Sequence, residues 1–332
     1  MTKKSFLPLL LVAALAQNIF FSSCSTDVDL LEEYKPITIV YGLLNINDTV
    51  QYIKINKAYL GEGNAILMAQ QRDSVNYQPG EIDVYLQKVG SSTLIPCDTT
   101  TQIAKDDGTF SNPYQLLFKT NTVLDPDGTY KLIINRHTDA ATITAATPIV
   151  KDLTIQQPSS PTAMLNLAST ASYYIRWQSG KNGKIYNVVM HIPYHEYTIS
   201  PADTQLKSID WNLGNVIGTH TFGNEDMSLE IGGEEFLRFL QATIPFDANR
   251  IRAFNDSDKV ELIITSGAED LYTYILINQP SIGLIQEKPA YTNISDGVGI
   301  FSSRWKKSYF NRLNQPTRDS LRNGRFTGSL FN

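Results

Sequence analysis

The sequence predicts a mainly β protein, with an N-terminal β-sandwich followed by a β-rich α+β domain that carries two short helices. Three observations predict this class. Short apolar runs, separated by turn residues, fill residues 36–150. The same pattern resumes at residue 173, and two later segments change to a helical period. The length of 332 residues allows two domains.

Composition excludes several classes of protein. A content of 42% hydrophobic and 18% charged residues is typical of a globular chain. The net charge of −5 argues against a nucleic-acid partner. Cys24 and Cys97 are the two cysteines, too few for a Cys-rich zinc site or a disulfide framework. Familiar catalytic motifs are absent from the sequence, so we expect no enzyme activity, no cofactor and no metal.

The N-terminal segment, residues 1–23, has the pattern of a secretory signal. Two lysines precede an apolar run over residues 6–16, and small residues follow. The sequence Phe-Ser-Ser-Cys at residues 21–24 resembles a bacterial lipobox. This resemblance implies that Cys24 is acylated and anchors the mature chain to a membrane. The alternatives are an ordinary cleaved signal and a retained anchor helix.

Residues 24–35 are rich in acids and form a predicted acidic tether. They resemble the export signal that sends Bacteroidota lipoproteins to the outer face of the outer membrane. This implies a lipid-anchored protein of the outer membrane on the cell-surface face. The periplasmic face remains the alternative, with the acids serving only as a solvated tether.

The first domain, residues 36–150, contains the short strand patterns that predict a sandwich of about seven strands. Expected strands cover residues 37–41, 50–55, 82–86, 114–118, 130–134 and 142–146. A Pro-Asp-Gly turn at residues 126–128 stands directly before the strand that opens near Tyr130. This arrangement resembles the tyrosine corner of immunoglobulin-like folds and implies an immunoglobulin-like β-sandwich.

Residues 151–172 carry little periodicity and are the predicted linker. The second domain covers residues 173–300. Its first two strands, residues 173–177 and 185–192, flank a Gly-containing turn and predict a hairpin. Further β signal is expected at Trp211 and over residues 219–222. Helices are expected near residues 234–241 and 268–278, where acids come early and apolar residues follow at helical spacing.

Two stretches carry a family resemblance. Residues 289–304 resemble the C-terminal signature of a group of Bacteroidota surface lipoproteins of unknown function, and residues 37–61 resemble their first strand pair. The resemblance implies an immunoglobulin-like domain followed by a family-specific β-rich domain, without defined catalytic residues. It also implies a partner role beside outer-membrane β-barrel proteins or TonB-dependent receptors.

The stretch from Asn293 to Arg304 is one candidate partner-binding element. Asp296 and the glycines beside it permit a tight loop with positive φ, and Ile294 and Phe301 are expected to anchor its ends in the core. Asn293 and Asp296 are the candidate binding residues. The alternative is a well-packed connection that closes the second domain.

The last segment, residues 301–332, is a predicted basic tail. Seven basic residues and one acidic residue give it a charge of +6, against −13 for residues 24–300. Arg304, Trp305, Lys306 and Lys307 interleave charge with an aromatic ring and are candidates for contact with an acidic partner or anionic head groups. The alternative is a solvated, partly irregular C-terminus.

His191, His195 and Glu196 form the best metal candidate, but a strand would place the two histidines about 13 Å apart. We therefore expect these histidines to form hydrogen bonds. The 17 tyrosines belong either to the β core or to an exposed platform for a glycan. The functional prediction is a non-enzymatic accessory or binding subunit of an outer-membrane β-barrel complex. The alternative is a glycan- or peptide-binding lipoprotein that serves a TonB-dependent receptor.

Overall fold

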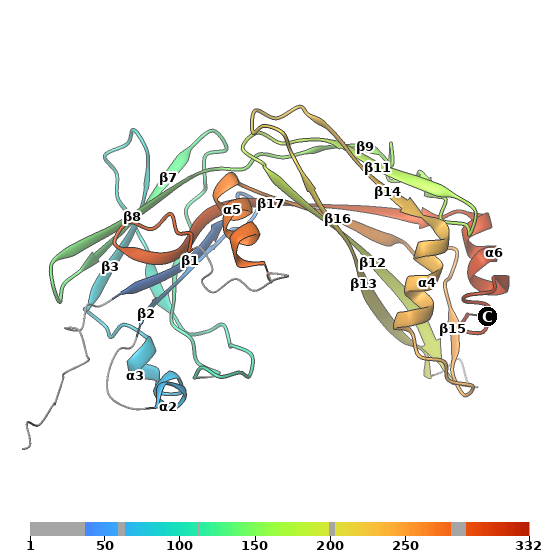
Figure 1. Cartoon of the computed structure of the whole chain (residues 1–332), viewed down its shortest axis with the longest axis horizontal. Helices are drawn as coiled ribbons and strands as arrows, with labels where there is room; N and C mark the ends of the chain where they lie inside the picture. The colour runs from blue at the N-terminus through green and yellow to red at the C-terminus, as the bar shows by residue number, and fades with distance from the viewer. Residues whose placement is uncertain (1–36, 59–63, 112, 199–202, 280–289, 332) are drawn as a thin grey trace, which may run out of the picture. The chain divides into compact units, whose positions relative to one another are not determined.

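The computed structural model describes residues 37–58, 64–111, 113–198, 203–279 and 290–331. Strands dominate this part of the chain, so the predicted mainly β class is confirmed (Figure 1). The predicted signal, Cys24 and the acidic tether lie outside the described residues. Within the described ranges, the longest apolar helices fall short of what a membrane crossing requires.

The N-terminal lobe consists of the described residues within 37–150 and 290–303. One of its sheets contains, in order, β1 (Thr38–Leu44), β2 (Gln51–Lys57), β6 (Leu117–Thr120) and β5 (Asp98–Thr100). The other contains β4 (Ile95–Pro96), β3 (Ile82–Lys88), β7 (Thr129–Arg136) and β8 (Ala141–Pro148). Two short helices, α2 (Ala65–Ala69) and α3 (Arg72–Val75), precede β3.

The two sheets of this lobe enclose one hydrophobic core, as a sandwich requires. Val40 and Ile53 reach it from one sheet, and Leu132 and Ile143 reach it from the other. The hydroxyl of Tyr130 accepts a hydrogen bond from the Asp125 backbone N–H at 2.8 Å. This is the bond that a tyrosine corner makes. The Pro-Asp-Gly turn before Tyr130 therefore serves to bring the Asp125 backbone to the Tyr130 hydroxyl.

The C-terminal lobe consists of the described residues within 151–279 and 304–331. Its strands are β9 (Thr154–Gln157), β10 (Met164–Leu165), β11 (Ser172–Gln178), β12 (Ile185–Tyr197), β13 (Gln205–Ile217), β14 (Asp226–Gly232), β15 (Ile251–Ala253), β16 (Val260–Gly267) and β17 (Gly297–Leu313). Its helices are α4 (Gly233–Thr243), α5 (Glu269–Asn278) and α6 (Gln315–Asn323). The first two coincide with the predicted helices.

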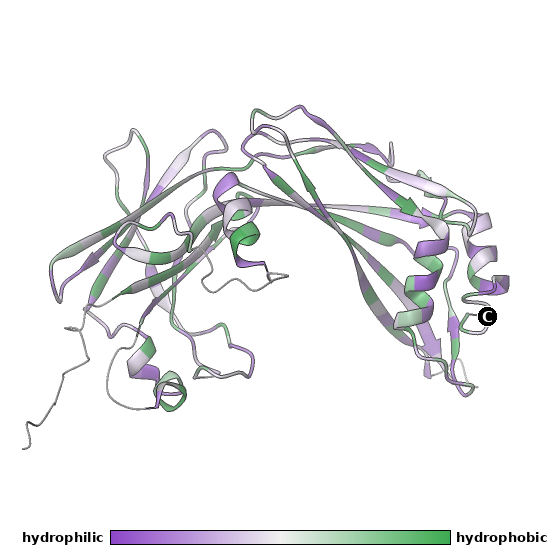
Figure 2. Cartoon of the chain, in the orientation of Figure 1, coloured by the Kyte–Doolittle hydropathy of each residue, from purple (hydrophilic) through white to green (hydrophobic). Residues whose placement is uncertain are grey.

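A second core fills this lobe. A three-stranded sheet in the order β14-β11-β9 faces the sheet that contains β13, β12, β16 and β17. Trp177 comes from the first sheet, Tyr186 from the second, and Phe236 from α4. Figure 2 shows hydrophilic and hydrophobic residues alternating along these strands, as expected where one face of a sheet is buried.

The prediction of a hairpin over residues 173–192 is wrong, because β11 and β12 do not pair with each other. Strand β11 pairs with β14 and β9, and β12 pairs with β13, β15 and β16. The two strands lie in different sheets, and the rings of Trp177 and Tyr186 meet between them at 5.9 Å. The turn passes close to another segment: a Cβ on Gly180 would lie 2.2 Å from the Lys151 carbonyl oxygen. Residues 219–222, also expected to be a strand, form an irregular, bent segment.

Strand β17 belongs to both lobes. Its first residues pair in parallel with β1, with Gly297 opposite Thr38, and its later residues pair antiparallel with β16. The predicted basic tail is therefore not a tail, since it contains most of β17 and all of α6. The predicted linker likewise contains β9 and β10, which pair with β11 and β17.

Candidate functional site

The predicted loop at Asn293 holds the N-terminal lobe together. The Asn293 side chain accepts from the Phe301 N–H at 3.0 Å and donates to the Phe301 carbonyl at 2.7 Å. Ile294 and Phe301 lie in the N-terminal core. Asp296 has a φ of 51° and places a carboxylate oxygen 3.8 Å from Arg136. The segment thus closes the first lobe rather than the second, and its Asn293 amide is occupied.

The basic residues of the C-terminal segment divide into those that form ion pairs within the chain and those that are exposed to solvent. Lys307 pairs with Asp152 at 2.8 Å, Arg318 with Asp256 at 3.1 Å, and Arg325 with Glu234 at 3.2 Å. These contacts join the basic segment to the acidic body of the same chain. In the predicted binding set, Arg304 and Lys306 are exposed and Trp305 is half-buried.

The histidines of β12 form hydrogen bonds with carboxylates. His191 Nδ1 lies 2.6 Å from Asp210 Oδ1, and His195 Nε2 lies 3.2 Å from Asp258 Oδ1. The two rings therefore engage different acids. The described part of the chain brings no three metal-ligating side chains together.

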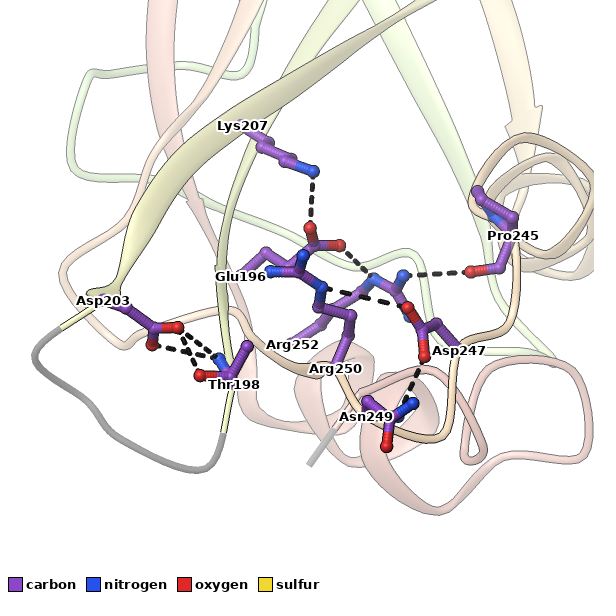
Figure 3. Close-up of polar contacts among 9 residues, drawn as sticks. All are labelled: Glu196, Thr198, Asp203, Lys207, Pro245, Asp247, Asn249, Arg250 and Arg252. Atoms are coloured by element: carbon purple, nitrogen blue, oxygen red, sulfur yellow. Dashed lines mark hydrogen bonds and ion pairs between the residues drawn. The ribbon is translucent and has the colours of Figure 1, made fainter.

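Glu196 lies on the face of β12 opposite to His191 and His195, and it is buried in a polar network (Figure 3). Arg252 Nε donates to Glu196 at 2.9 Å, and Lys207 donates to its other oxygen. Arg252 also donates to the Pro245 carbonyl at 2.9 Å. Burial acts to raise the pKa of Glu196, but the bonds from Lys207 and Arg252 outweigh it and hold the pKa below the usual value. The network braces β12, β13 and β15 against one another.

A cavity of about 260 Å³ lies on the outer face of the β1–β2 pair. Because successive side chains alternate across a strand, Val40 and Ile55 enter the core while their neighbours form the floor of this cavity. Tyr41 lies directly opposite Lys54, and Ile39 lies opposite Asn56. The floor therefore consists of cross-strand neighbours fixed by the register of the hairpin.

The walls come from two other segments. Asn56 donates to the Val75 carbonyl at 2.9 Å, which fixes the end of α3 at one side. The other side is a segment whose described residues are 105–111 and 113–115, and it brings Lys105, Phe110 and Tyr114 to the cavity. It is held by a hydrogen bond from the Ser111 N–H to the Ala69 carbonyl at 3.0 Å.

We call this cavity the lysine pocket and define it by Tyr41, Lys54, Lys105, Phe110 and Tyr114. No acidic residue lines it within the described ranges. Burial lowers the pKa of Lys54, and the positive charge of Lys105 lowers it further. The ammonium group of Lys105 lies 5.0 Å from the centroid of the Phe110 ring, within the range of a cation–π contact.

This arrangement offers two cations and three aromatic rings. Among the described residues that line it, Ser111 is the one hydroxyl that is not a phenol, and no imidazole or carboxylate is present to activate it. Cations and exposed rings of this kind can bind a ligand. Sequence reasoning missed this pocket, because the floor and the wall lie some 50 residues apart and no local pattern connects them.

No family model and no curated protein match this chain. Among solved structures, one described as "Cytokine receptor complex - Crystal form 2" covers 70% of this chain and 92% of its own, at 10% identity and a TM-score of 0.21. A crystal structure of CBD12 from CALX1.2 covers 83% of this chain and 99% of its own, at 9% identity and a TM-score of 0.14. Scores this low transfer neither a fold nor a function to the chain.

Proposed function

We propose that this chain is a non-enzymatic surface lipoprotein, anchored to the outer membrane through Cys24, that holds a small ligand for a partner β-barrel of the TonB-dependent receptor class. The observation that supports it most is the lysine pocket, a built cavity with aromatic and cationic walls. Such concave sites with few polar groups are the usual form of a ligand site. The lipobox-like residues and the acidic tether support the anchoring and the location.

A second candidate is the accessory subunit of an outer-membrane β-barrel complex, without a small ligand. The edge strand β13 favours it. This strand spans 13 residues and, in the sheet as described, has β12 as its only neighbour. Unpaired backbone groups on a long edge can accept a strand from a partner. Leu206 on this strand is 69% exposed.

Affinity purification of the tagged protein from gently solubilised outer membranes tests both candidates. We expect a stoichiometric barrel partner, and we expect Cys24→Ala to remove the protein from the membrane fraction. Recovery of the protein alone, or membrane attachment that survives Cys24→Ala, would contradict the proposal.

A surface variant separates the two candidates. If β13 is the docking edge, Leu206→Glu abolishes recovery of the partner, whereas Leu94→Glu, which alters an exposed leucine of the N-terminal lobe, leaves it intact. Retention of the partner by both variants favours the ligand-binding candidate.

A further inference from the structure

We infer that the lysine pocket selects small organic anions, with the acid group near Lys54 and Lys105 and an apolar or aromatic body against Tyr41, Phe110 and Tyr114. This inference names the class of ligand, and it rests on the proposed function only for the role of that ligand in the cell. The binding itself is a property of the isolated chain.

Charge is the first argument. Residues 24–300 carry a net charge of −13, yet the described lining of this cavity includes no acid and, besides Lys54 and Lys105, a third lysine, Lys57. Lys57 has a partner, because its Nζ lies 3.3 Å from Glu81. Within the part of the chain that the structure describes, no carboxylate lies within 4.0 Å of Lys54 or Lys105. A ligand anion would supply the missing negative charge.

Partial desolvation is the second argument. Lys54 is half-buried, and among the described residues its ammonium group has one acceptor, Gln115 Oε1 at 3.4 Å. An ammonium group can donate three hydrogen bonds, so donors remain for a ligand. Two neighbouring ammonium groups that are partly removed from water repel each other, which makes the charged form of each less favourable. An anion bound between them would offset this repulsion.

The walls decide what accompanies the acid group. Tyr41, Phe110 and Tyr114 are 46%, 55% and 58% exposed, although aromatic side chains of this size bury readily. Arg72 lies 5.7 Å from the Tyr114 ring centroid and keeps that ring in place. The cavity of about 260 Å³ is slightly below the usual range of about 300–1,000 Å³ for ligand pockets. A compact ligand with a flat apolar face fits these walls, and a folded macromolecule does not.

Isothermal titration of the purified full chain with a matched pair of probes tests the inference. The pair is naphthalene-2-sulfonate and its uncharged analogue naphthalene-2-sulfonamide, titrated at one fixed detergent concentration. We expect the sulfonate to bind about tenfold or more tightly than the sulfonamide, because charge-assisted hydrogen bonds are the stronger ones. Equal affinity for the two probes, or no saturable binding of the sulfonate, overturns the inference.

Lysine variants locate the binding. Lys54→Gln and Lys105→Gln should each weaken sulfonate binding about tenfold and leave sulfonamide binding unchanged. Lys57→Gln should have a smaller effect because Lys57 is already paired, and Lys131→Gln on β7 in the opposite sheet should have none. Unchanged binding by both Lys54→Gln and Lys105→Gln overturns the inference, provided that thermal unfolding shows the variants to be folded.

The outcome is independent of the partner. The titration contains no barrel protein, so its failure leaves a co-purified partner standing and removes only the ligand class. Conversely, a protein recovered without a partner but with sulfonate selectivity loses the barrel assignment and keeps the pocket.

Discussion

Glu196 and Arg252 place opposite charges inside the C-terminal lobe, with side chains 6% and 3% exposed. Removing Arg252 leaves the buried Glu196 with Lys207 as its remaining cation, and breaking a buried pair costs about 3–5 kcal/mol. We expect Arg252→Ala to lower the free energy of unfolding by about that amount, measured by chemical denaturation at neutral pH. Arg250→Ala is the matched control, because Arg250 is 37% exposed and its pair with Asp247 spans 3.8 Å. An exposed pair contributes about 0–1 kcal/mol.

The same pair predicts a dependence on pH. The bonds from Lys207 and Arg252 hold the pKa of Glu196 below its ordinary value in the folded state, so the stabilisation is present above that ordinary value and is lost as the pH falls through the folded-state value. The difference in stability between the wild type and Arg252→Ala should therefore shrink on acidification. A difference that stays constant down to pH 2.5 would show that Glu196 does not carry the effect.

Cys97 shows at the same scale how burial controls reactivity. Its side chain lies in the N-terminal core, and burial raises the pKa of its thiol to about 12. The thiolate is the reactive form, so Cys97 should resist iodoacetamide in the native protein at pH 8 and react fully in denaturant. Peptide mass spectrometry reports the modification at this site. Rapid native labelling would show that the core around Cys97 opens.

At the scale of the element, β17 depends on one glycine. Gly299 has a φ of 108°, and a Cβ there would lie 2.0 Å from the Val40 carbonyl oxygen. Gly90 also has a positive φ, of 88°, but has open space around it. Gly90→Ala should cost about 1–2 kcal/mol from backbone conformation alone. Gly299→Ala should cost several kcal/mol more, because the new methyl group separates β17 from β1.

Denaturation of the two variants side by side measures this difference. Equal losses at the two positions would mean that the β1–β17 contact adjusts without cost, and the close approach would then be irrelevant to stability.

Sequence patterns located most elements of the N-terminal lobe, because alternation and turn chemistry are local. They failed where the partner of a strand is distant. The turn at Gly180 has hairpin residues, yet its two strands lie in opposite sheets. Helix α6 had a local signal that sequence reasoning passed over: Asn314 caps it through the Thr317 N–H at 3.0 Å, and Pro316 stands in its first turn.

The candidate site divides in the same way. The exposed positions of Arg304 and Lys306 agree with a strand whose charges point to solvent, but the pairing of Lys307 with Asp152 depends on tertiary structure. The lysine pocket depends on the β1–β2 register and on where residues 105–111 and 113–115 lie, and neither can be read from composition. The sequence shows that acidic residues dominate residues 24–300 and basic residues dominate residues 301–332. It does not show that the two regions form ion pairs with each other.

At the scale of the whole molecule, the N-terminal lobe is discontinuous in sequence. Residues 37–150 alone lack β17, and they therefore leave β1 unpaired on one side and Phe301 missing from the core. We expect a fragment of residues 37–150 to be largely unfolded by circular dichroism. A single chain that joins residues 37–150 to residues 290–304 by a flexible linker should recover β structure and a cooperative thermal transition. A stable fold of the shorter fragment would show that β17 is dispensable to this lobe.

The sharing of β17 also sets an order in time. A chain emerging from the ribosome presents β1 long before it presents Gly297, so the first lobe stays incomplete until most of the chain has been made. Until then β1 exposes a strand edge to every other chain nearby, and such edges favour aggregation. A chain cut short before Gly297 lacks the strand that both lobes share, so neither lobe is complete and no folded half-molecule is expected to persist.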